Sequence, residues 1–137
     1  MARLTIRVDL GQGGALGPGK IRLLELIRAH GSISEAGRAM SMSYRRAWLL
    51  VDQLNRSFRH PVVSKQTGGR RGGGASLTPW GLRLVKRYRA IESDAALAVA
   101  AHLRALALAR SGRRLEAARR LAPARRRRVS GARRATR

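Results

Sequence analysis

The sequence has no cysteine, few acidic residues and no long apolar run, and each of these shortages excludes a class of protein or site. Without cysteine, the chain can form neither disulfides nor thiolate metal sites. Its 7 acidic residues are too few for a pair of catalytic carboxylates to stand out. No apolar run approaches the roughly 18 residues of a membrane span, and MARLTIRVDL lacks the order of a signal peptide. We therefore expect a cytoplasmic location, in the nucleoid, and no membrane partner.

Basic residues are present in large excess. The 137 residues include 30 lysines and arginines, which give a formal net charge of +23. Solubility does not require so much charge, and a polyanionic partner explains it more simply. Nucleic acid is the first candidate and an anionic membrane surface is the second.

Residues 32–58 predict two helices joined by a tight turn. Ser32 with Glu35 three positions later is typical of a capping box, and Ser43 can cap the second helix. Apolar and small residues recur at helical spacing along both helices: Ile33, Ala36, Gly37, Met40, Ala47, Leu50, Val51, Leu54 and Phe58. This is the pattern of a helix-turn-helix, whose second helix lies in the major groove of DNA. The same pattern also occurs in proteins that bind no DNA, but the basic composition favours DNA binding.

The start of the second helix carries the residues expected to contact DNA. Tyr44, Arg45 and Arg46 follow Ser43 directly, and the two arginines lie opposite the apolar stripe. Side chains at this end of a recognition helix reach base edges. We therefore expect these residues to face double-stranded DNA.

A second DNA contact is predicted in the segment that follows. Residues 62–67 and 75–77 predict two short strands around the loop GGRRGGG, which together form a β-hairpin wing. Arg70 and Arg71 are placed in this loop to meet phosphates or the minor groove. The alternative is a mobile surface loop without a partner. The glycines around two arginines in so basic a chain favour nucleic acid.

The N-terminal segment predicts a strand, a glycine-rich loop and a helix. Residues 4–10 alternate between apolar and polar side chains, as in a half-buried strand. After the loop, Ile21, Leu23, Leu24 and Ile27 give the helix its buried stripe, and Gly31 ends it.

The glycine-rich loop also fits a phosphate-binding motif. Gly14, Gly19 and Lys20 match G-x-x-x-x-G-K between a strand and a helix. However, Ile21 stands where the motif needs Ser or Thr for magnesium, and no later strand ends in an acid. A simple strand-to-helix connection is therefore favoured over nucleotide hydrolysis. We expect no enzyme activity, no cofactor and no metal site.

The C-terminal third predicts one long helix and a basic tail. Thr78 and Pro79 open a helix, and the apolar pattern continues to Ala109. This face is larger than a small core can cover, so we expect a homodimer. Residues 111–137 contain 11 arginines and one acid, a composition that favours disorder. Such a tail could add non-specific DNA affinity or be a solvated end without a role, and both remain open.

Together these features predict a mainly α fold with a small β-hairpin. We expect a winged helix-turn-helix domain over residues 1–94, with an N-terminal strand and a long C-terminal helix. Residues 95–110 would continue that helix for dimerisation, and residues 111–137 would form the basic tail.

Three motifs carry a resemblance to a known family. MSYRRAW, TGGRRGGGA and LTPWG occur here as they do in the N-terminal winged-helix domain of the ModE family of molybdate-responsive transcriptional regulators. The chain resembles that domain from about residue 4 to residue 91, and SISEAGRAM also resembles the more distant LysR-type regulators. The resemblance implies that the terminal strand and long helix serve dimerisation. It also assigns residues to the recognition helix and to the wing: Ser43, Tyr44, Arg45, Arg46 and Trp48 to the former, and Arg70 and Arg71 to the latter.

The chain departs from the family pattern in three ways. Gly37 stands where the second of two alanines is usual, and Ser41 stands where many helix-turn-helix proteins have glycine. A positive φ at Ser41 would cost about 1 kcal/mol at most. ModE regulators also carry C-terminal molybdate-binding domains, whereas no molybdate site is evident after residue 91 here. We therefore expect no molybdate response from this chain.

These observations predict a sequence-specific DNA-binding transcriptional regulator. The alternative is a non-specific nucleoid-associated or RNA-binding protein in which the basic tail dominates and the winged helix only packs.

Overall fold

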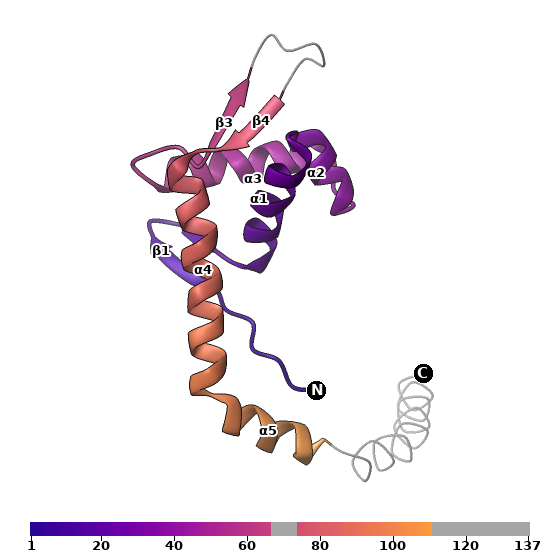
Figure 1. Cartoon of the computed structure of the whole chain (residues 1–137), viewed down its shortest axis with the longest axis vertical. Coiled ribbons are helices and arrows are strands. Elements are labelled where there is room, and N and C mark those ends of the chain that lie inside the picture. Colours follow the sequence, from indigo (N-terminus) through magenta and orange to yellow (C-terminus); the bar gives the residue numbers. More distant parts are fainter. Residues whose placement is uncertain (67–73, 111–137) are drawn as a thin grey trace, which may run out of the picture. The chain divides into compact units, whose positions relative to one another are not determined.

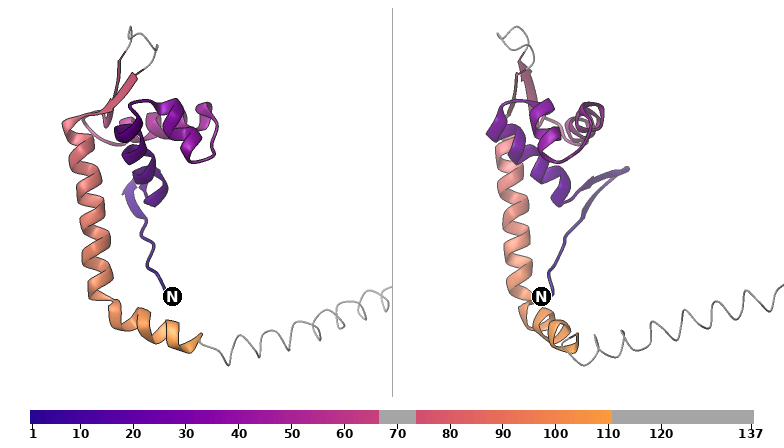
Figure 2. Two further views of the ribbon diagram at one scale, coloured as in Figure 1. Left: turned by 45° about the vertical axis from the view of Figure 1, so that its right-hand side comes forward. Right: turned by 90° about the vertical axis from the view of Figure 1, so that its right-hand side faces the viewer.

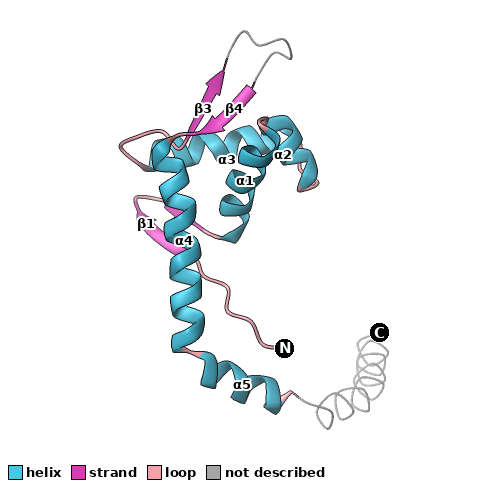
Figure 3. Cartoon of the chain, in the orientation of Figure 1, coloured by secondary structure: helices cyan, strands magenta, loops and turns pink. Residues whose placement is uncertain are grey.

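The computed structural model describes residues 1–66 and 74–110. Within them, a pair of short strands precedes three helices, and a second pair precedes two more (Figure 3). The elements in chain order are β1 (Val8–Gly11), β2 (Gly14–Leu16), α1 (Pro18–His30), α2 (Ile33–Ala39), α3 (Tyr44–Ser57), β3 (Val63–Gln66), β4 (Gly74–Leu77), α4 (Pro79–Ala98) and α5 (Ala100–Ala109). No helix in these two ranges is both long enough and apolar enough to cross a lipid bilayer.

The chain divides into two units, which are described separately. Thr5–Ala95 forms the first unit and holds all four strands, α1 to α3 and most of α4. Within this unit, α1, α2 and α3 lie close together, and the β3–β4 hairpin projects beyond them (Figures 1 and 2). The described residues of the second unit are 1–4 and 96–110.

The hydrophobic core of the first unit is built around α1. The predicted buried stripe of this helix is confirmed, since Ile21, Leu23, Leu24 and Ile27 are all buried. The remaining buried residues come from every neighbouring element: Leu16, Ile33, Ala36, Ala47, Val51, Leu54, Val62, Val63, Ala75, Leu84 and Tyr88. The helix ends at Gly31, as predicted, with φ 69° and its N–H donating to the Ile27 carbonyl at 2.7 Å. The core therefore joins the helix-turn-helix to the wing and to α4.

The N-terminal segment differs from the prediction of one strand over residues 4–10 followed by a loop. The strand β1 begins only at Val8, and the glycine-rich segment turns back to form β2, which pairs with it antiparallel. The turn residues Gln12 and Gly13 have φ values of 50° and 82°. Positive φ at both central positions is typical of the tight hairpin turn that matches strand twist. Leu10, expected on the half-buried face, is exposed.

The C-terminal helix also differs from the prediction. In place of one helix to Ala109, α4 ends at Ala98 and α5 begins at Ala100. Val99 separates them with φ −108° and ψ 10°. Valine is β-branched and loses side-chain freedom in a helix, so it is a weaker helix former than the alanines around it. No residue of α5 is buried, and Leu106 and Leu108 are 60% and 73% exposed.

Polar contacts attach α4 to the rest of the first unit. The Tyr88 hydroxyl donates to the Ile6 carbonyl at 2.6 Å. The Arg89 guanidinium donates to Glu25 of α1 at 2.7 and 3.2 Å and to Glu92 at 2.6 Å. The hydrogen bonds from Arg89 lower the pKa of Glu25, and the same bonds raise the pKa of Arg89. These contacts hold α4 and the N-terminal segment against α1.

Candidate nucleic-acid interface

Both helices of the predicted helix-turn-helix form and are capped as their sequences indicate. The Ser32 hydroxyl accepts a hydrogen bond from the Glu35 N–H at 3.2 Å and begins α2. The Ser43 hydroxyl accepts one from the Arg46 N–H at 3.1 Å and begins α3. Each cap satisfies one of the N–H groups that the first turn of a helix leaves without a partner.

The turn between the helices depends on Ser41 and Gly37. Ser41 has φ 58°, the left-handed conformation, for which sequence analysis gave a cost of about 1 kcal/mol at most. The Gly37 carbonyl accepts hydrogen bonds from the N–H groups of Met40 and Met42, both at 3.0 Å. A Cβ at Gly37 would lie 2.8 Å from the Cβ of Ala47, closer than real Cβ atoms approach. Glycine therefore lets α2 pack directly against α3, which fixes the angle at which α3 is presented.

The first turn of α3 is exposed and basic. Ser43, Tyr44, Arg45 and Arg46 are all exposed, and this turn contains no acidic residue. In the described part of the chain, neither arginine forms an ion pair. Both guanidinium groups are therefore available to a ligand. The next apolar residue, Ala47, is fully buried and anchors the turn to the core.

Trp48 is placed between α3 and the wing. Its indole is half-buried, and the ammonium nitrogen of Lys65 on β3 lies 4.4 Å from the ring centroid. Cation–π contacts of this kind contribute about 0.5–1 kcal/mol at exposed sites. The structure thus gives Trp48 a contact to the wing strand as well as a position on α3. Nothing in the sequence indicated that Lys65 would contact Trp48.

The predicted wing is a hairpin in the structure. Strands β3 and β4 pair antiparallel from Val63 opposite Leu77 to Gln66 opposite Gly74. The wing residues Arg70 and Arg71 lie outside the described residues. The Ala75 N–H donates to the Gly31 carbonyl at 2.9 Å, so the end of α1 supports β4.

Asn55, which sequence analysis did not single out, holds the wing against α3. Its side-chain oxygen accepts hydrogen bonds from the N–H groups of Val62 and Val63 at 2.7 and 3.0 Å. Its amide nitrogen donates to the Val63 carbonyl at 3.3 Å. Asparagine is a poor helix former. Its presence in the interior of a helix is the only feature of the sequence that could have pointed to this role.

Thr78 and Gly81 fix the same end of the wing, where β3 begins and β4 ends. The Thr78 hydroxyl donates to the Pro61 carbonyl at 2.6 Å and accepts from the Gly81 N–H at 3.0 Å, which caps α4. A Cβ at Gly81 would collide with the Val62 carbonyl oxygen. Recognition helix, wing and α4 therefore meet at one closely packed junction.

The chain is similar in sequence to curated ModE proteins. No family model matches the chain. It is 42% identical over 94 residues to the molybdenum transport protein ModE of Azotobacter vinelandii, covering 69% of this chain and 34% of that protein. It is 37% identical over 87 residues to the DNA-binding transcriptional dual regulator ModE of Escherichia coli K12, covering 64% and 33%. The chain thus spans about a third of the length of the curated relatives it matches.

A solved structure supports the fold. A point mutant of S. aureus MepR matches with a TM-score of 0.52 at 16% identity, over 64% of this chain and 66% of that chain. MepR has a winged-helix fold, and the likeness shows that this chain contains a winged helix-turn-helix fold, as predicted.

Proposed function

From the premise that the N-terminal two thirds of this chain is homologous to ModE proteins, we propose that it is a sequence-specific DNA-binding transcriptional regulator. In this proposal residues 1–94 form the DNA-binding domain, and the protein acts in the cytoplasm on chromosomal DNA. The first turn of α3 enters the major groove. The observation that carries the proposal is the exposed pair Arg45 and Arg46, without acidic partners in the described structure, at the capped start of α3.

The chemistry of this turn suits base recognition. An arginine side chain can donate two parallel hydrogen bonds to O6 and N7 of guanine, a contact that contributes about 1–3 kcal/mol of discrimination. Ser43 and Tyr44 lie beside the arginines and offer hydroxyl groups to phosphates or bases. Trp48 and Lys65 hold β3 next to α3, and Arg70 and Arg71 would then meet the DNA backbone.

The proposed active form is a homodimer. Leu97 and Leu106 are 77% and 60% exposed on the helices beyond the first unit. Exposed leucines on two successive helices favour burial against another chain, and a second copy would give two-fold symmetry. Two recognition helices would then bind half-sites separated by whole helical turns.

The basic tail favours a second candidate function. Residues 111–137 carry 11 of the 30 basic residues and one acid. Phosphate contacts from such a segment add affinity for every sequence alike. A nucleoid-associated or RNA-binding protein would use this segment and need no base contacts from α3.

Selection of binding sites from a random duplex pool separates the two functions. The purified full chain would be incubated with the pool at physiological salt, and bound DNA would be sequenced after several rounds. We expect an imperfect palindrome whose half-sites are one or two helical turns apart. A pool that binds without enriching any motif would contradict the proposed function and favour the nucleoid type.

A further inference from the structure

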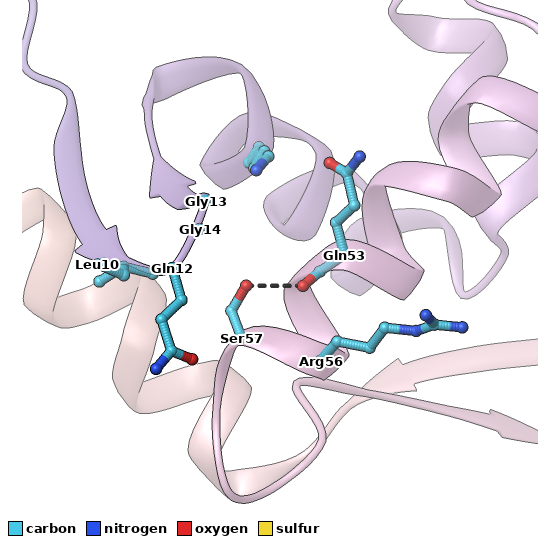
Figure 4. Close-up of a pocket in the computed structure, with 9 residues that line it drawn as sticks. Leu10, Gln12, Gly13, Gly14, Gln53, Arg56 and Ser57 are labelled. Carbon is cyan, nitrogen blue, oxygen red and sulfur yellow. Dashed lines mark hydrogen bonds between the residues drawn. The ribbon is translucent and has the colours of Figure 1, made fainter.

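A pocket lies between the β1–β2 hairpin and the C-terminal half of α3, in a part of the fold that the proposed function does not use. It has a volume of about 550 Å³ and is lined by residues 10–14, by Lys20 of α1, and by Gln53, Arg56 and Ser57 of α3. Figure 4 shows the hairpin facing the α3 side chains across this space. The hairpin turn and the last two turns of α3 therefore form opposite walls.

The charged side chains that line the pocket are all basic. Lys20 and Arg56 line it, and no acidic residue does so among the lining residues that the structure describes. Arg56 is neutralised by Asp52, since its Nε lies 3.1 Å from a carboxylate oxygen. Lys20 has no such partner in the described part of the chain. Its ammonium donates one hydrogen bond, to the Ala15 carbonyl at 2.8 Å, which leaves two donors.

The surroundings of Lys20 increase the cost of this unpaired charge. Burial lowers the pKa of Lys20, and repulsion from Arg7 lowers it further. Arg7 itself is paired with Asp9 at 3.0 Å, and this carboxylate is not among the groups lining the pocket. An anion placed beside the Lys20 ammonium would relieve the repulsion and use the two remaining donors.

The neutral groups around the pocket are also suited to an oxyanion. Gln53 carries an amide group at the end of an exposed side chain on α3. The Ser57 hydroxyl donates its one hydrogen to the Gln53 backbone carbonyl at 2.7 Å, so the Gln53 amide is the neutral side-chain donor that remains. Glycines at 11, 13 and 14 leave the backbone accessible, and a Cβ at Gly14 would lie only 3.3 Å from the Ser57 oxygen. Glycine at this position therefore suits the close approach of the hairpin to α3.

We propose that this pocket binds a small oxyanion of the phosphate class, with Lys20 as the charged ligand. Gly14 and Lys20 of the G-x-x-x-x-G-K match line the pocket, but not as a nucleotide loop. Gly14 lies in β2, and Gly19 lies in the first turn of α1. The phosphate could be free in solution or belong to the backbone of bound DNA, and the experiment below distinguishes these sources.

The test is a titration of the full chain with inorganic phosphate at constant ionic strength, followed by amide NMR. We expect saturable shifts of the Gly11, Gly13 and Gly14 amides. Lys20→Met removes the charge and keeps most of the side chain, so phosphate binding should weaken at least about tenfold, whereas Lys20→Arg should largely retain it. Lys86→Met, at an exposed position on α4, is the matched control and should leave binding unchanged.

A second variant keeps the proposal testable should Lys20→Met fail to fold. Ser57→Asp places a carboxylate opposite Lys20 and should abolish the phosphate shifts. Shifts that never saturate, or that Lys20→Met and Lys86→Met reduce equally, would show general counter-ion binding and overturn the proposal.

Measuring the DNA affinity of the same variants shows whether the phosphate is free or belongs to DNA. If the anion is free, Lys20→Met should leave affinity for random duplex unchanged within about twofold. If it is a DNA phosphate, the variant should lower affinity for every sequence and reduce the salt slope by about one, and duplex should block the phosphate shifts. Either result supports the oxyanion site, and neither depends on whether α3 contacts bases.

Discussion

Gly37 and Ala47 pack directly against each other between the two helices of the helix-turn-helix, since a Cβ at Gly37 would lie 2.8 Å from that of Ala47. Both residues are buried. A larger residue at either position would push α3 away from α2 and change how the recognition helix is presented. The usual alanine of the family pattern is therefore absent for a steric reason that can be tested.

We expect Gly37→Ala to destabilise the protein by about 1–3 kcal/mol. Alanine is the better helix former by about 1 kcal/mol, but overpacking against Ala47 outweighs this gain. Urea denaturation followed by circular dichroism measures the difference. Gly19→Ala in α1 is the control, because a Cβ there meets no atom within 4 Å, and it should not destabilise. Equal stability of Gly37→Ala and the parent protein would refute the close contact.

Ser41→Gly should stabilise the protein by about 1 kcal/mol. Ser41 has φ 58°, and glycine adopts this conformation without the steric cost that a Cβ brings. Ser34→Gly, inside α2, should instead destabilise by about 1 kcal/mol, because glycine is a poor helix former. Denaturation midpoints in urea would decide between these opposite signs. A loss of stability in Ser41→Gly would mean that the Ser41 side chain itself supports the turn.

Asn55→Ala should destabilise the protein by about 1–3 kcal/mol and loosen the start of the wing. The substitution leaves the Val62 and Val63 N–H groups without their acceptor, which costs the desolvation of partly buried donors. Asn55→Asp retains an acceptor oxygen and should lose less. Urea denaturation and amide hydrogen exchange of residues 62–66 measure the two effects. Unchanged exchange in Asn55→Ala would show that the wing does not depend on this side chain.

The contribution of Glu25 to stability should depend on pH. Because hydrogen bonds from Arg89 lower its pKa in the folded protein, this contribution is present above the unfolded pKa of about 4.3 and is lost as pH falls through the folded value. The stability difference between the parent protein and Glu25→Gln should therefore be large near about pH 7 and small near about pH 3. Asp94→Asn, at an exposed position on α4, should change stability little at either pH. A constant difference for Glu25→Gln would contradict the ion pair with Arg89.

The local features of the helix-turn-helix could be predicted from sequence because their causes are local. The caps at Ser32 and Ser43 and the end of α1 at Gly31 each depend on a few neighbouring residues. The buried stripe of α1 followed from helical periodicity alone.

The features that could not be predicted depend on contacts between distant residues or on weak signals. Gln12 is not a residue preferred at a hairpin turn, so β2 was expected to be loop. Val99 interrupts the C-terminal helix without a glycine or proline to mark the place. Two further contacts join residues 7 to 17 positions apart in sequence: the Asn55 hydrogen bonds and the contact between Lys65 and Trp48. The periodicity of apolar residues does not predict such contacts.

The most direct test of the central claim compares affinity for a selected site with affinity for random duplex. Arg45→Ala and Arg46→Ala would be measured beside Arg87→Ala, a control at an exposed position on α4, and beside a full-length variant with residues 125–128 changed to glutamine. Equilibrium binding at several salt concentrations gives the specificity ratio and the salt slope of each.

At least one of Arg45→Ala and Arg46→Ala should lower the specificity ratio by about tenfold or more, as the loss of a base contact worth about 1–3 kcal/mol requires. The variant at residues 125–128 should weaken binding to both duplexes alike, flatten the salt slope and keep the ratio. Arg87→Ala should leave the ratio unchanged. If both α3 variants keep the full ratio while the tail variant abolishes it, the helix-turn-helix is only a scaffold and the account of sequence-specific binding is wrong.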